Sequence, residues 1–270
     1  MPIITISRGS YSMGKTVAER VAKQLQFDLL SRDVLLDASR RYNVTEIKLI
    51  NAIHDAPGIL QRYSHNKQSY ITYIRSSLVE RVLNDNIVYH GLAGHLLLKE
   101  IPHVLKVRIT ENLESRIRNR VERDKVSARK ARSLTLNDDR QRRKWTLSLY
   151  GEDPWNAALY DLSICIDKLS LDDAVDFICR AAGTQALQTT EEGQQKLEDM
   201  AVSCRVKAFL VDEFPHVGVT CEYGNVLVYT KSKDPAGSRL LKKLKEIREK
   251  TDGIHHLETH AGIELPENAI

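Results

Sequence analysis

The stretch that decides the fold lies near the N-terminus and reads Gly9-Ser10-Tyr11-Ser12-Met13-Gly14-Lys15-Thr16. It matches the pattern G-x-x-x-x-G-K-[ST], in which the glycines let backbone N–H groups turn inward around a phosphate. An apolar, β-branched run over residues 2–7 precedes it, and residues 15–25 carry apolar side chains at helical spacing. A strand, a glycine-rich loop and a helix in this order predict a P-loop.

The residue types in this loop suit ATP and Mg²⁺, which are the cofactors we expect. Lys15 would place a charge between the β- and γ-phosphates, and the Thr16 hydroxyl would ligate Mg²⁺. The helix that follows would point its positive end at the phosphates. The predicted nucleotide-binding residues are Gly9, Ser12, Met13, Gly14, Lys15 and Thr16. The alternative is a glycine-rich turn that carries an exposed lysine.

Strands and helices alternate as far as residue 183. The expected strands are residues 2–7, 86–90, 103–109 and 162–166. The expected helices are residues 15–25, 31–42, 45–54, 69–83, a segment capped by Thr110 that runs to about 124, and 171–182, with a loop at Pro57-Gly58 and a cap formed by Ser170 and Asp173. This alternation predicts a parallel sheet with helices on both faces, an α/β fold of three layers.

The pattern changes after residue 183. Residues 184–193 are small and polar and predict a linker. A helix over 194–210, two strands joined by a turn at Tyr223-Gly224-Asn225, a helix opened by Pro235 and a last strand over 254–260 follow. We therefore expect a P-loop domain over 1–183 and a small α+β domain over 194–270.

The charge is concentrated in one segment. Residues 116–144 hold twelve Lys or Arg and four Asp or Glu, while the whole chain has a formal net charge of only +4. One helix face carries Arg116, Arg120 and Arg123, and a stretch that we expect to be a loop carries Asp139, Arg140, Arg142, Arg143 and Lys144. Arginines on a closing lid would neutralise the charge that develops during phosphoryl transfer. A solvated basic helix and an RNA-contacting patch are the alternatives.

Cysteine usage and hydropathy indicate the compartment. Cys165, Cys179, Cys204 and Cys221 are widely spaced, which is typical of reduced, mostly buried thiols. No run approaches the roughly 20 apolar residues that span a bilayer, and the N-terminus does not have a signal-peptide pattern. We expect a cytoplasmic protein without a membrane partner.

Several further features occur in a fixed order. They are the Ile-Thr-Ile-Ser-Arg-Gly-Ser start before Gly14-Lys15-Thr16, Asp33 after a short strand at 27–30, Gly91, the arginine-rich helix after Thr110, Asp139-x-x-Arg142-x-x-Trp145, the aromatic stretch 150–155, and Tyr160-Asp161-Leu162. This order resembles the cytidylate-kinase-like P-loop proteins, relatives of bacterial CMP kinases, over roughly residues 2–178. The resemblance implies a five-stranded parallel sheet in the order 2-3-1-4-5.

The resemblance also implies roles for individual residues. Lys15 would hold ATP phosphates, and Arg140, Arg142 and Arg143 would be lid arginines, with Arg142 the best match. Asp33 and Gly91 would face the acceptor. One departure is Leu92, because the family commonly has an arginine there that would bind the acceptor phosphate. The segment 194–261 more weakly resembles a BON module, which would have a docking or regulatory role.

These observations favour a phosphotransferase of the nucleoside monophosphate kinase type, cytidylate-kinase-like, that moves the ATP γ-phosphoryl to a small acceptor such as a nucleotide. The alternative is a catalytically weak or inactive ATP-binding regulatory protein whose C-terminal domain binds a protein partner; Leu92 and the appended domain motivate it. A third reading is a nucleic-acid-binding regulator that uses residues 116–144. We favour a small-molecule partner over nucleic acid, because the basic charge is confined to one segment.

Overall fold

The structure is a computed structural model that describes residues 2–54, 65–231 and 238–270. Its larger sheet consists of β1 (Ile3–Arg8), β2 (Asp28–Leu30), β3 (Ile87–Tyr89), β4 (Val104–Glu111) and β5 (Leu162–Ile166). The strand order is β2-β3-β1-β4-β5, and every pairing is parallel. The predicted sheet and its strand order are thus confirmed.

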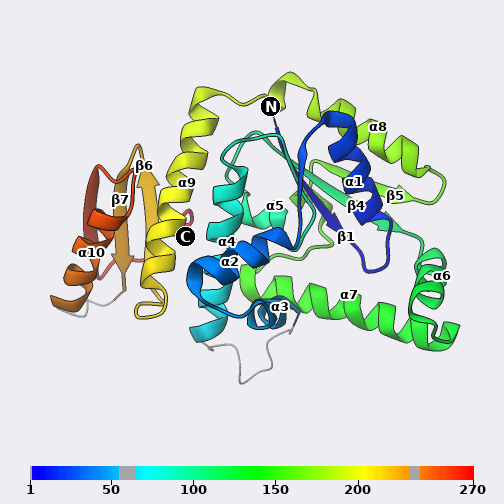
Figure 1. Cartoon of the computed structure of the whole chain (residues 1–270), viewed down its shortest axis with the longest axis horizontal. Coiled ribbons are helices and arrows are strands. Elements are labelled where there is room, and N and C mark those ends of the chain that lie inside the picture. Colours follow the sequence, from blue (N-terminus) through cyan, green and yellow to red (C-terminus); the bar gives the residue numbers. More distant parts are fainter. Residues whose placement is uncertain (1, 55–64, 232–237) are drawn as a thin grey trace. The chain divides into compact units, whose positions relative to one another are not determined.

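The central strand β1 is apolar because both of its faces are covered. Its Ile4 and Ile6 pack in a core with α1 (Gly14–Leu25) and α8 (Leu171–Ala182), which lie on one side of the sheet (Figure 1). Alternation along the strand turns Ser7 to the other face, where it meets the short helix α5 (Gly94–Leu97). Helix α8 starts with the predicted capping box of Ser170 and Asp173.

Two helices follow β4. Helix α6 (Leu113–Asp124) is capped by the Asn112 side chain, which accepts from the Glu114 N–H at 2.8 Å, and not by Thr110, which lies within β4. Helix α7 runs from Ala128 to Tyr150, so the expected loop around residues 139–144 is wrong. The segment from 113 to 150 contains no glycine or proline to interrupt a helix, and α7 ends only at Gly151, which has a φ of 69°.

The chain divides into two compact units, and the second combines residues 34–52, 63–83 and 190–270. It contains α4 (His65–Val82), α9 (Glu191–Leu210) and all but the terminal residues of α2 (Asp33–Tyr42) and α3 (Glu46–His54). Helix α4 packs along α9 (Figure 1). The Tyr73 hydroxyl donates to Asp212 at 2.7 Å, just beyond the end of α9. The domain boundaries at 183 and 194 remain a prediction from the sequence, although α9 begins at Glu191, within the expected linker.

The C-terminal sheet contains β6 (Gly218–Glu222), β7 (Asn225–Thr230) and β8 (His256–Ala261), with β6 antiparallel and β8 parallel to β7. Tyr223 and Gly224 form the turn with φ values of 49° and 74°. The helix α10 (Ser238–Lys250) completes the predicted order of elements. The predicted loop at Pro57 and Gly58 and the predicted helix start at Pro235 lie outside the described residues. Within the described residues, no helix is long and apolar enough to cross a membrane.

Candidate active site

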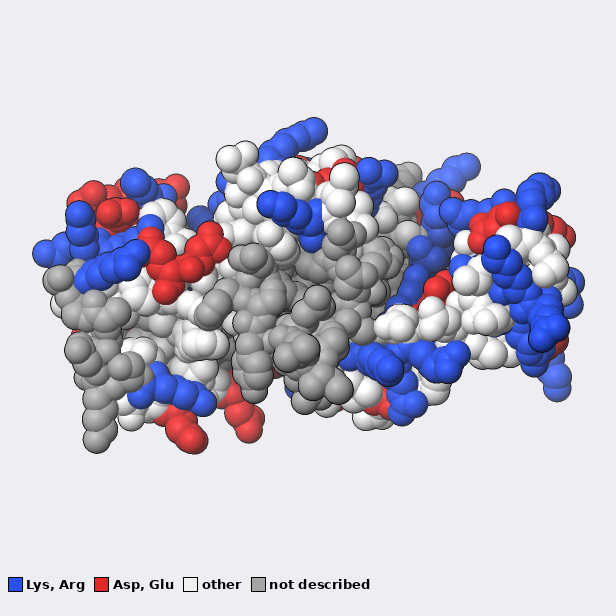
Figure 2. Space-filling view, turned by 90° about the horizontal axis from the view of Figure 1, so that it is seen from below, with Lys and Arg blue, Asp and Glu red and all other residues white. Residues whose placement is uncertain are grey.

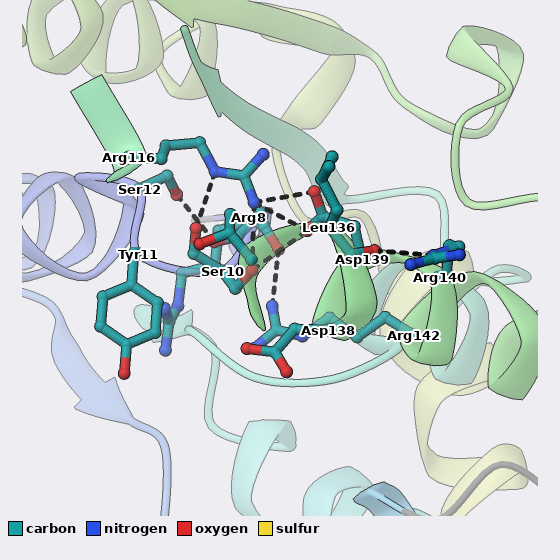
Figure 3. Close-up of polar contacts among 12 residues, drawn as sticks. Arg8, Ser10, Tyr11, Ser12, Arg116, Leu136, Asp138, Asp139, Arg140 and Arg142 are labelled. Carbon is teal, nitrogen blue, oxygen red and sulfur yellow. Dashed lines mark hydrogen bonds and ion pairs between the residues drawn. The ribbon is translucent and has the colours of Figure 1, made fainter. Parts of the chain in front are cut away.

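The P-loop connects β1 to α1 at the carboxyl end of the sheet (Figure 3). The Ser12 hydroxyl donates to the Gly9 carbonyl at 3.0 Å and closes the turn. The first turn of α1 contains no acidic residue, and the cap position has no side-chain hydrogen bond. The positive end of the helix dipole is therefore not neutralised within the helix itself, as a phosphate site requires.

Gly14 is required by close packing at the start of α1. A Cβ at this position would lie 2.6 Å from the Cβ of Arg8 and 2.9 Å from its Cδ. The Cβ of Arg8 is fixed by the strand and cannot retreat, so no side chain fits at position 14. This tight junction brings the loop backbone close to β1.

Lys15 and Thr16 are exposed at the first turn of α1. The Lys15 ammonium lies 3.4 Å from Glu19, one helical turn further on, and the two side chains are 66% and 46% exposed. An ion pair this exposed contributes little free energy, so the ammonium group can leave it for a phosphate. The predicted nucleotide-binding residues thus form one continuous loop and helix start.

Arg116 supports the loop from α6. It donates to the Ser10 carbonyl at 2.7 Å and to the Ser10 hydroxyl at 3.0 Å, and it bonds both Asp139 oxygens at 2.7 and 2.8 Å (Figure 3). The residue is only 9% exposed. From the sequence we expected this guanidinium on a basic helix face of a lid that acts on the phosphates. In the structure it is buried, and its hydrogen bonds connect α6 to α7 and to the loop.

Arg120 and Arg123 surround the Tyr11 ring. Their guanidinium groups lie 4.2 and 5.5 Å from its centroid, and the Tyr11 hydroxyl donates to Asp124 at 2.6 Å. Arg120 also pairs with Asp138 at 2.9 Å. Because Tyr11 has a φ of 56°, these contacts hold the loop in a left-handed conformation that a tyrosine rarely adopts.

The three predicted lid arginines have different surroundings. Arg142 reaches the loop and donates to the Arg8 carbonyl at 3.0 Å, and burial lowers the pKa of its guanidinium. Arg143 pairs with Asp153 at 2.6 Å and stacks on Trp155. Arg140 is exposed, and its Nε donates to the Leu136 carbonyl of its own helix at 3.3 Å. Arg142 is therefore the member of this set that meets the P-loop.

Other cations of this segment face the solvent. Figure 2 shows Lys and Arg gathered over α6 and the adjoining part of α7. The exposed residues there are Arg118, Lys125, Arg129, Lys130 and Arg132. Arg132 pairs with Glu114 at 2.6 Å, and both side chains are more than half exposed.

The two predicted acceptor residues lie at the ends of elements. Asp33 begins α2, and Gly91 follows β3. A side chain at position 91 would overlap the Tyr89 hydroxyl, so glycine is required there for packing. Leu92 accepts from this same hydroxyl through its carbonyl at 3.3 Å. The roles of Asp33 and Gly91 toward an acceptor remain predictions.

The structure adds three residues to this site that we did not select from the sequence. Arg8 ends β1, and its pKa is lowered to about 10 by burial and by the Arg142 and Arg123 guanidiniums. His90 follows β3, and Glu111 ends β4. The one signal for Arg8 was a charged residue at the end of an otherwise uncharged strand.

Glu111 bonds directly to the P-loop backbone. One carboxylate oxygen accepts from the Met13 N–H at 3.1 Å, and the other accepts from the Asn119 amide at 3.2 Å. Asn119 also donates to the Tyr11 carbonyl at 3.1 Å. Burial raises the pKa of the Glu111 carboxyl. A loop N–H that could serve a phosphate is thus held by a carboxylate.

A parallel sheet in the order 2-3-1-4-5 and a G-x-x-x-x-G-K-T loop between its central strand and the following helix define the P-loop class of nucleotide and small-molecule kinases. The chain belongs to the cytidylate kinase-like family, whose model matches residues 3–168. It is thus a kinase-type phosphotransferase. The match ends before α8, so the C-terminal sheet lies outside it.

Individual known proteins are also similar to this chain. The cytidylate kinase of Staphylothermus marinus is 28% identical over 184 residues, which cover 66% of this chain and 94% of that protein. An uncharacterized protein from Eubacterium ventriosum has a solved structure with a TM-score of 0.52 at 17% identity, covering 68% of this chain and all of that one. The shikimate kinase of Bacteroides thetaiotaomicron has a TM-score of 0.42 at 10% identity, covering 68% and 99% of the two chains.

Proposed function

We propose that this kinase transfers the γ-phosphoryl group of ATP to a small acceptor, with nucleoside monophosphates, CMP among them, as the first candidates. The observation that carries the proposal is the hydrogen bond from Arg142 of α7 to the Arg8 carbonyl at the start of the P-loop. It brings a lid cation to the loop that presents Lys15. Cations from two distant segments can then act on one phosphate chain.

The residues present suit Mg·ATP. The loop backbone is free of side-chain bulk at Gly14, the α1 N-terminus is not neutralised by an acid of its own, and Lys15 is exposed beside it. Thr16 would hold Mg²⁺, which when bound neutralises charge on the phosphates. Among the chain's own residues, Lys15 would orient the β- and γ-phosphates and Arg142 would stabilise the negative charge that develops on the transferred group.

The transfer itself requires no covalent enzyme intermediate. An acceptor oxygen attacks the γ-phosphorus in line, the bond to the β–γ bridging oxygen breaks, and ADP leaves with that electron pair. The acceptor proton passes to solvent. The task of the protein is then to position the two reactants and to exclude water while α7 holds its arginines over the loop.

The decisive experiment measures ATP consumption with a panel of nucleoside monophosphates that includes CMP. We expect turnover with at least one of them, and we expect Lys15→Ala to abolish both ATP binding and turnover while the protein stays folded. Lys23→Ala, which removes an exposed lysine from the last turn of the same helix, is the matched control. A wild-type protein that binds ATP but turns over none of the panel would refute the proposal.

Leu92 supports a second candidate, an ATP-dependent regulatory protein. The segment after β3 contains no Lys or Arg from Gly91 to Leu98, so it offers no cation to an acceptor phosphate. In this reading the nucleotide state would change how the C-terminal segment, with its BON-like order of elements, binds a protein partner. ATP would then alter the protease sensitivity of residues 184–193, and identical cleavage with and without ATP would contradict it.

A further inference from the structure

Arg8 is a partly buried cation at the P-loop that has no matching anion among the described residues. Its side chain packs against the Gly14 backbone, and Arg142 and Arg123 lie close enough to lower its pKa. Among the described residues, no carboxylate forms an ion pair with Arg8, although Arg116, Arg120 and Arg143 each have one. A partly buried charge without a counter-charge is less well solvated than an exposed one, and binding of an anion compensates for this.

His90 lies near enough to Arg8 for the guanidinium to lower the pKa of its imidazole. Tyr89 of β3 is in register with Thr5 of β1, so His90 comes level with Ile6, two residues before Arg8. Its backbone N–H donates to the Leu30 carbonyl at 2.9 Å, and its Nδ1 lies 3.2 Å from the Ser31 hydroxyl. These contacts orient the imidazole ring from β2 as well as from β3.

The other ring nitrogen of His90 is unused. Its Nε2 is buried and has no hydrogen-bond partner within the part of the chain that the structure describes, and the residue is only 7% exposed. Burial, Arg8 and Lys15 lower the pKa of this imidazole to about 4, with Glu19 acting in the opposite direction, so the ring is neutral at pH 7. A buried polar atom without a partner costs free energy, and a hydrogen bond to a ligand group would recover it.

We propose that Arg8 and His90 Nε2 together bind one phosphate dianion of a substrate, on the strand side of the P-loop. The guanidinium supplies charge and paired donors, and a neutral imidazole with Nε2 protonated donates one further hydrogen bond. Ser31 favours this tautomer when its hydroxyl donates to Nδ1. The proposal rests on the proposed kinase function. Arg8 and His90 would take the phosphate-binding role of the cation that is missing at Leu92.

A phosphate dianion at this place is either the γ-phosphate of ATP or the phosphate of a monophosphate acceptor. Equilibrium binding of ATP, ADP and CMP to the full-length protein separates the two. The variant Arg8→Met has an unbranched side chain that keeps the contact with Gly14. We expect it to weaken binding of either ATP or CMP by roughly 10- to 100-fold, while ADP binding stays unchanged. A loss of affinity for ATP would show that Arg8 and His90 bind the γ-phosphate. A loss of affinity for CMP would show that they bind the phosphate of the acceptor.

Companion variants keep the test specific. Arg8→Lys should recover part of the affinity that Arg8→Met loses. His90→Phe should weaken binding of the same ligand as Arg8→Met does. The control is Arg129→Ala, at an exposed arginine at the start of α7, which should change none of the three affinities. An affinity loss that ADP shares, or no loss for any ligand, would overturn the proposal. These experiments measure binding, so their result does not depend on turnover. An absence of turnover would contradict only the proposed kinase reaction.

Discussion

The carboxylate of Asp139 accepts two hydrogen bonds from Arg116, at 2.7 and 2.8 Å, while the same guanidinium bonds the backbone of the P-loop at Ser10. The pair thus connects α7 to α6 and both helices to the loop. The side chains are 11% and 17% exposed, so the ion pair is only partly screened by water.

Removal of this carboxylate should loosen the phosphate site. Asp139→Ala leaves the Arg116 charge buried and unpaired, and we expect the free energy of unfolding to fall by about 2 to 4 kcal/mol. ATP affinity should fall as well, because Ser10 loses its support. Glu114→Ala breaks the exposed pair with Arg132 and should cost less than about 1 kcal/mol. Denaturant unfolding measures the loss of stability in both variants. Equal losses for Asp139→Ala and Glu114→Ala would contradict the role given to the Arg116–Asp139 pair.

A side chain at Gly14 should be excluded by the packing at the start of α1. In Gly14→Ala the new Cβ would meet the Cβ of Arg8 at 2.6 Å, and overpacking of this kind costs roughly 1–3 kcal/mol. We expect ATP binding to be lost in calorimetry because the loop must move. Gly183→Ala is the control, since its nearest neighbour is 3.5 Å away and its φ is −80°; its stability should not fall. Normal ATP binding by Gly14→Ala would show that the loop tolerates the shift.

Glu111 should oppose nucleotide binding. Its carboxylate holds the Met13 N–H and adds a negative charge beside the phosphate site. Glu111→Gln removes the charge and should strengthen ATP binding by roughly 3- to 10-fold. Glu114→Gln, in the first turn of α6, changes the same net charge at an exposed position and should have a smaller effect. Weaker ATP binding by Glu111→Gln would instead indicate that the carboxylate organises the loop for the nucleotide.

His95 should make the fold sensitive to acid. Its ring nitrogens lie 2.9 Å from the Ser7 hydroxyl and 3.2 Å from the Tyr160 hydroxyl, and burial together with Arg108 and Lys106 lowers its pKa from 6.5 to about 4. Between these values the unfolded chain binds a proton that the folded protein does not. The free energy of unfolding therefore falls as pH drops from about 6.5 to about 4, by up to roughly 3 kcal/mol for this histidine.

Denaturant unfolding at pH 7, 6 and 5 measures this dependence. His95→Gln should have a shallower pH dependence than the wild type over this range, although it is less stable at pH 7. His256→Gln, in an exposed histidine of β8, should keep the wild-type slope. Parallel curves for the wild type and His95→Gln would show that another group titrates.

Local patterns predicted much of the fold. The apolar run before Gly9, the helical spacing after Lys15 and the capping signature at Ser170 each act over a few residues, and the structure contains all three elements. The resemblance supplied the strand order, which spacing alone does not determine. The error at residues 139–144 came from reading charge as a sign of a loop, although arginine and lysine are good helix formers.

The sequence by itself determined the P-loop and the alternation of strands and helices, because these depend on residues that are close together in the chain. Only the tertiary structure decided what surrounds the loop. Arg116 meets Ser10 across 106 residues, Arg142 meets Arg8 across 134, and Glu111 meets Met13 across 98. The parallel sheet places the ends of β1 and β4 at one edge, and α6 and α7 bring Arg116 and Arg142 to the same loop. Three charged residues that are distant in the chain therefore meet there.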